Sequence, residues 1–138
     1  MEEKQLAINE LNNTDYSLVV VKNSKVEYRS KEESVGSIVN LLENRPELLK
    51  NAVVADKIIG RAVAMVCDFA SVNYCYGQIV SKGAVDVFEN NNLSYKAAEV
   101  VEAIKNRDNT DLCPIEKLTL DINDSAKGIE KIKEFLNN

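Results

Sequence analysis

The chain has 138 residues, of which 45% are hydrophobic and 28% are charged, a composition typical of one globular domain with a single core. Acidic residues outnumber basic ones by 22 to 17, and the net charge of −5 argues against general nucleic-acid binding because phosphate backbones carry the same sign. The acidic start MEEKQ does not resemble a secretory signal, and the longest apolar run is too short to span a bilayer, so we expect a cytoplasmic protein without a membrane partner. Three cysteines without close spacing fit reduced thiols in that compartment.

The first part of the chain predicts a helix, a hairpin and a second helix. Residues 3–11 place their leucines and isoleucine at roughly helical spacing. Residues 16–30 contain two β-branched runs around Asn23 and Ser24, which is typical of two strands joined by a tight turn. A capping box of Ser30 and Glu33 predicts the start of the next helix, and Pro46 ends or kinks it.

Strands and helices alternate in the remainder. A short apolar run after residue 51 predicts a buried strand, Asp56 is placed to cap a long apolar-faced helix, and residues 73–80 predict a fourth strand. Ser81 is expected to cap the next helix, and residues 93–97 predict a fifth strand. Residues 98–107 and 125–136 are expected to be helical or loop additions.

This alternation predicts the α/β class, with a three-layer α/β/α architecture and a five-stranded mixed sheet. The first hairpin supplies the antiparallel part of the sheet, and parallel strands with right-handed crossovers follow it. We expect one domain over residues 1–138, in which residues 119–138 form a C-terminal helical extension.

Three segments carry a family resemblance: LVVVKNSKVEYRS, LLENRPELLKNAVVADKIIGRAVAM and NRDNTDLCPIEKL. They resemble a small uncharacterised prokaryotic family, domain of unknown function 1893, that has a cytidine-deaminase-like fold. The likeness covers most of residues 16–118 and leaves out about the last twenty residues. It implies a cytidine-deaminase-like fold but no established reaction.

The chain departs from the active zinc deaminases in its metal-binding residues. Those enzymes use a His or Cys two residues before a catalytic Glu, together with a Cys-x-x-Cys pair, to surround the metal. This chain has no histidine and no Cys-x-x-Cys, and Cys67, Cys75 and Cys113 lack ligand spacing. We therefore expect no metal ligands and no cofactor.

The segment ADKIIGR is the first candidate for a ligand site. In an open parallel sheet, ligands bind outside the carboxyl ends of the strands, where adjacent connections depart in opposite directions and helix N-termini point toward the opening. Asp56 is expected to cap the helix, Lys57 and Arg61 to share one helical face, and Gly60 to allow close approach of a ligand. The alternative is a capped helix with two solvated cations and no site.

Cys113 is the second candidate, with three interpretations: a zinc ligand, a reactive thiol, or a helix cap. Pro114 suits the first position of a helix, which would make Cys113 the cap residue and Glu116 its capping-box partner. A thiol at a helix start also favours thiolate, to which Arg107 would contribute. Cys67 and Cys75 lie among apolar residues and are expected in the core.

Two functions of different classes follow. The first is a metal-free binding module for a small ligand, nucleotide-like or otherwise anionic, held by Asp56, Lys57, Gly60, Arg61, Arg107 and Cys113. The second is a metal-free enzyme in which Asp56 or Glu116 moves protons, Lys57 or Arg61 stabilises negative charge, and Cys113 is a nucleophile. A structural partner of another protein is a third alternative, and a homo-oligomer is compatible with all three.

Overall fold

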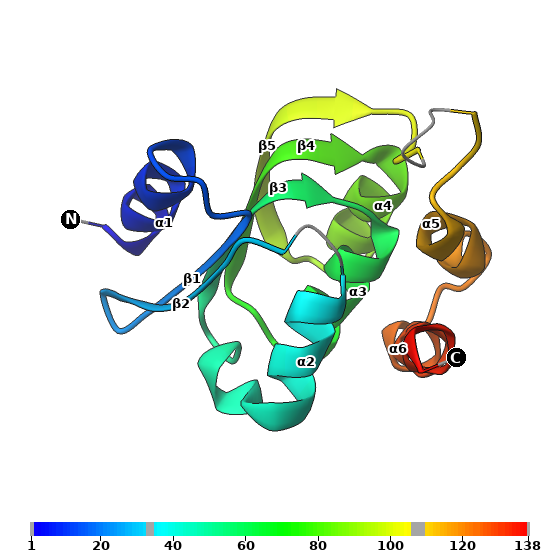
Figure 1. Cartoon of the computed structure of the whole chain (residues 1–138), viewed down its shortest axis with the longest axis horizontal. Coiled ribbons are helices and arrows are strands. Elements are labelled where there is room, and N and C mark those ends of the chain that lie inside the picture. Colours follow the sequence, from blue (N-terminus) through cyan, green and yellow to red (C-terminus); the bar gives the residue numbers. More distant parts are fainter. Residues whose placement is uncertain (1, 33–34, 106–109, 138) are drawn as a thin grey trace.

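A computed structural model describes residues 2–32, 35–105 and 110–137 of the chain. It contains a five-stranded sheet with helices on both faces (Figure 1). The elements are α1 (Glu3–Asn12), β1 (Leu18–Lys22), β2 (Lys25–Ser30), α2 (Gly36–Asn44), the 3-10 helix η1 (Pro46–Leu48), β3 (Val53–Ile59), α3 (Arg61–Phe69), β4 (Tyr74–Ser81), α4 (Lys82–Asn90), β5 (Ser94–Val101), α5 (Pro114–Thr119) and α6 (Ser125–Leu136).

The predicted hairpin is confirmed at the predicted turn. Asn23 and Ser24 join β1 to β2, and both have positive φ, at 54° and 64°. A two-residue turn with left-handed backbone at both positions matches the right-handed twist of the strands that it connects. The hairpin therefore follows from local sequence alone.

The strand order is β2-β1-β3-β4-β5, with β1 antiparallel to both β2 and β3 and with β3, β4 and β5 parallel. The predicted class, α/β with a mixed five-stranded sheet and an antiparallel first hairpin, is confirmed. β2 and β5 form the two edges of the sheet.

Two cores hold the layers together. On one face, α1 packs its buried Ala7 and Leu11 against β1 and β3. On the other face, α2, α3 and α4 share one larger core with the sheet, and α5 and α6 pack outside α3 (Figure 1). The expectation that adjacent strand connections depart in opposite directions is wrong, because all three connecting helices lie on one face.

The sheet changes its alternation partway along the parallel strands. Val54 and Cys75 form one cross-strand pair, Ile59 and Val80 form another, and all four belong to the core beneath the helices. Residues five apart would point to opposite faces of a regular strand. Lys57, Gln78 and Ala98 are left out of the parallel pairing between β3, β4 and β5. Each of the three strands therefore contains one unpaired residue, which shifts its side-chain alternation by one position.

Three predicted elements have different bounds in the structure. β3 continues to Ile59, and β5 continues to Val101, so part of the segment predicted as helix or loop is a strand. Ser30 ends β2 and does not cap α2, whose N-cap is Val35; Glu33, the other half of the predicted capping box, lies outside the described residues. None of the described helices is long and apolar enough to cross a membrane.

Candidate functional site

β3 and β4 each lead into a helix at the same edge of the sheet. Gly60 connects β3 to α3, and Ser81 ends β4 and begins α4. The Ser81 hydroxyl accepts a hydrogen bond from the backbone N–H of Ala84 at 3.1 Å, which confirms the predicted cap. The starts of α3 and α4 thus lie at the carboxyl edge of the sheet, where the sequence predicted the site.

Arg61 is the first residue of α3 and is 5% exposed. Its guanidinium donates to the backbone oxygens of Thr119 at 2.8 Å, Gly83 at 3.0 Å and Ile122 at 2.5 Å, and to Asn123 Oδ1 at 3.2 Å. These acceptors come from α4, α5 and the link to α6. The buried guanidinium therefore connects the start of α3, at the end of the parallel sheet, to the C-terminal helices through hydrogen bonds.

Glu116 on α5 caps α3 from a distance in sequence. Its Oε1 accepts from the backbone N–H of Arg61 at 2.7 Å, and its Oε2 accepts from the N–H of Ile104 at 3.0 Å. Gly60 makes room for this carboxylate, since a Cβ there would lie 3.3 and 3.4 Å from its two oxygens. A carboxylate at a helix N-terminus is favoured by the helix dipole, so this position is already filled by the protein itself.

These contacts correct the predicted roles of the ADKIIGR segment. Asp56 and Lys57 lie within β3, so Asp56 does not cap α3, and Lys57 does not share a helical face with Arg61. The guanidinium of Arg61 faces backbone oxygens instead of an opening. Arg107, also predicted to bind a ligand, lies outside the described residues.

Asp56 is a partly buried carboxyl in the carboxyl half of a central strand. It is paired with Gly77, whose added Cβ would meet Val80 and Ile59 of the helix-side core, so the Asp56 side chain also faces the helices. Its Oδ1 accepts from the N–H of Ile58 at 3.2 Å. Burial outweighs this hydrogen bond and raises the pKa of Asp56 from 3.8 to about 7.

Two thiols lie in the core on the same side as Asp56. Cys67 and Cys75 are both fully buried, as the sequence predicted. Burial, reinforced by a hydrogen bond with Cys67 and by the negative charge of Asp56, raises the pKa of Cys75 well above its usual range. Both thiols are therefore packing groups, and the raised pKa of Cys75 keeps that thiol protonated.

Cys113 occupies the N-cap position of α5, with Pro114 as the first helical residue, as predicted. Its side chain accepts no capping hydrogen bond, and its N–H donates to the Ile104 oxygen at 2.9 Å. The predicted capping box is wrong because Glu116 binds the start of α3 instead. No hydrogen bond or ion pair joins Cys113 to Asp56 within the described residues.

We expect Cys113 to react with a thiol reagent faster than Cys67 or Cys75. It is half-buried, whereas the other two are closed off in the core, and reactivity follows exposure as well as thiolate content. Brief alkylation of native protein followed by mass spectrometry ranks the three sites. Equal rates in native protein would contradict this order, and denatured protein is the control in which the three should react alike.

Other candidate sites have weaker support. Within the described ranges, no group of three His, Cys, Asp or Glu side chains is arranged to hold a metal ion. A shallow surface depression of about 480 Å³ lies between the end of α4 and the start of β5, near the amino ends of the parallel strands. Its Tyr95 stacks on Phe88 at 4.9 Å and donates its hydroxyl hydrogen to Glu89 at 3.2 Å.

Comparisons with known proteins give one family and one fold. Residues 6–136 match the model of a family described as a domain of unknown function (DUF1893). The match includes α6, so the expected end of the likeness near residue 118 is wrong. The crystal structure of a DUF1893 family protein (TM1506) from Thermotoga maritima is similar with a TM-score of 0.87 and 22% identity, covering 94% of this chain and 87% of that one. No curated protein matches the chain.

Proposed function

Since the chain belongs to the DUF1893 family, we propose that it binds a small, uncharged, hydrogen-bonding ligand, of the kind a nucleobase or nucleoside presents, beside Asp56. The observation that carries the proposal is the partly exposed Asp56 carboxyl, whose pKa burial raises to about 7. A group with a strongly shifted pKa at the carboxyl half of a parallel strand is a candidate functional residue. The proposal uses no metal and no cofactor.

The charges around this edge favour an uncharged ligand over the anion expected from the sequence. The guanidinium of Arg61 is buried on protein oxygens, and the start of α3 holds the Glu116 carboxylate. An anion would meet these carboxyl groups, and among the described residues the buried cation, Arg61, already donates to protein oxygens. Lys57, a predicted site residue within β3, is the cation for which we still propose a role in ligand binding.

Asp56 suits a ligand that both donates and accepts hydrogen bonds. A carboxyl titrating near neutral pH offers an O–H donor when protonated and only acceptors when ionised. Cyclic amides and amidines, the polar edges of nucleobases, need both kinds of partner. The resemblance of the sequence to the cytidine-deaminase-like fold supports the same ligand class.

A metal-free enzyme is the second candidate, and the same carboxyl favours it. A general acid or base is most effective when its pKa lies near the working pH, as that of Asp56 does. Glu116 and Arg61 are better suited to holding the fold than to chemistry, because their polar atoms are bonded to backbone. Cys113 remains a candidate residue in the lining of the proposed site. Conversion of a bound nucleoside would distinguish the enzyme from the binding module.

A thermal-shift screen tests the proposal. Uncharged nucleobases and nucleosides should raise the melting temperature, by about 2.7 kcal/mol of stability at a hundredfold excess over Kd, while inorganic phosphate should not. Asp56→Ala should abolish the shift, because alanine offers the ligand no hydrogen-bonding side-chain atom. Asp86→Ala, at an exposed aspartate on α4, should leave it unchanged. Stabilisation by phosphate alone, or a nucleoside shift that survives Asp56→Ala, would contradict the assignment.

A further inference from the structure

The two edges of the sheet differ in how they are protected. β2 alternates the charged residues Lys25, Glu27 and Arg29 along its length, and Arg29 is paired with Glu10 of α1 at 2.9 Å. The β1–β2 ladder also contains an irregularity between Val20 and Val21. Charges and irregular pairing are the usual means of preventing another strand from adding to an edge.

β5 lacks this protection. It is eight residues long, pairs on one side with β4, and has no partner on its outer side in the described part of the chain. Its sequence SYKAAEVV carries only two charged side chains, and Val100 is 50% exposed. An exposed edge of this length presents a row of free backbone donors and acceptors.

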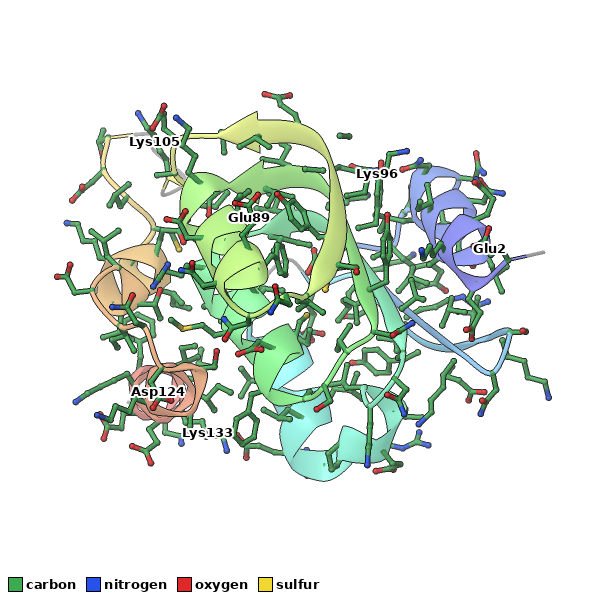
Figure 2. All side chains as sticks on the ribbon, turned by 180° about the vertical axis from the view of Figure 1, so that it is seen from behind. Glu2, Glu89, Lys96, Lys105, Asp124 and Lys133 are labelled. Carbon is green, nitrogen blue, oxygen red and sulfur yellow. The ribbon has the colours of Figure 1, made fainter. Side chains whose placement is uncertain are left out.

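The shift in alternation places the two charges of β5 on the same face. Lys96 lies in a cross-strand row with Ala55 and Tyr76, which belong to the core beneath α1, and Figure 2 shows it on the side of β5 toward α1. Glu99 is paired with Ile79, in the row next to the Val80 row that faces the helices. Both side chains therefore point away from α4, although their odd spacing would separate them in a regular strand.

We propose that a second copy of this chain adds to β5, with the two β5 strands antiparallel about a twofold axis between Ala97 and Ala98. In this register Lys96 of each copy lies opposite Glu99 of the other, on the same face of the sheet. The two small alanines meet at the axis. The arrangement is self-complementary, as a twofold interface requires.

The remaining pairs in that register also fit. Tyr95 packs against the helix-side core, and Val100 is paired with Val80 of the same core, so both side chains face the helices. Across the axis they would form an aromatic and β-branched pair, a favourable cross-strand combination. Ser94 would lie opposite Val101, so the whole of β5 is paired. The interface is distinct from the Asp56 site and does not depend on the proposed ligand.

Charge reversal tests both the surface and the register. In sedimentation equilibrium, Lys96→Glu should weaken dimerisation by about tenfold or more, because both ion pairs across the axis become repulsive. The double variant Lys96→Glu with Glu99→Lys should restore wild-type affinity. Lys25→Glu on β2 is the control and should leave self-association unchanged.

Three results would contradict the proposed dimer or its register. A wild-type chain that is monomeric up to about 1 mM, where even weak association is detectable, would overturn the proposal. Dimerisation that survives Lys96→Glu would assign the interface to another surface, and a double variant that stays dissociated would overturn the register. Circular dichroism of each variant verifies that the fold is intact.

Discussion

Replacing Glu116 with alanine is expected to lower the free energy of unfolding by about 3 to 5 kcal/mol. The change leaves the backbone N–H groups of Arg61 and Ile104 without their acceptor in a buried setting. It also removes the negative charge that interacts favourably with the N-terminus of α3. Urea denaturation followed by circular dichroism measures the loss.

Two further variants make this result interpretable. Glu130→Ala removes an exposed carboxylate from α6 and should change stability by no more than about 0.5 kcal/mol. Glu116→Gln keeps one acceptor oxygen but places an amide NH₂ against one of the two N–H donors, so its loss should be intermediate. If Glu116→Ala lowers the free energy of unfolding no more than Glu130→Ala does, the hydrogen bonds of the Glu116 carboxylate do not stabilise the fold.

The elements set by local chemistry were predictable from the sequence. Asn23 and Ser24 between two β-branched runs specify a hairpin turn, because asparagine accepts positive φ more readily than most residues and serine is common in turns. Ser81 before an apolar helical pattern specifies a cap. In both cases the groups that decide the structure lie within a few residues of each other.

The end of β3 was mispredicted because pairing outweighs local preference. Asp56 before an apolar run resembles an N-cap, yet β1 pairs with this segment as far as Asp56 and β4 pairs with it through Ile59. The same holds for residues 99–101, which pair with β4 as part of β5. Strand formation depends on neighbours that are distant in sequence, and a single sequence does not identify them.

The role of Glu116 could not be found from sequence spacing. Its position three residues after Cys113 suggested a local capping box, whereas its carboxylate binds Arg61, 55 residues earlier. No local signal in the sequence indicates this contact, because the burial that makes Arg61 and Glu116 require partners is a property of the folded chain. Only the tertiary structure shows which partners they are.

Replacing Asp56 with asparagine is expected to stabilise the protein above neutral pH and to change little at pH 4. The pKa of Asp56 is raised from 3.8 to about 7, so between these values the folded state holds a proton that the unfolded state has released. Stability from this group is therefore full below about pH 4, falls as pH rises toward 7, and stays constant above that. A shift of this size corresponds to about 4 kcal/mol, which partial exposure reduces to about 2 to 4 kcal/mol.

The measurement is the difference in unfolding free energy between Asp56→Asn and wild type from pH 4 to pH 8. Asparagine keeps an oxygen that accepts the Ile58 N–H and cannot ionise, so the difference isolates the buried charge. It should grow between pH 4 and 7 and then level off, while the same difference for Asp86→Asn should stay flat. A variant less stable than wild type at pH 8 would mean that ionised Asp56 has a stabilising partner, and the carboxyl would then not be the neutral-pH donor on which the proposed ligand site depends.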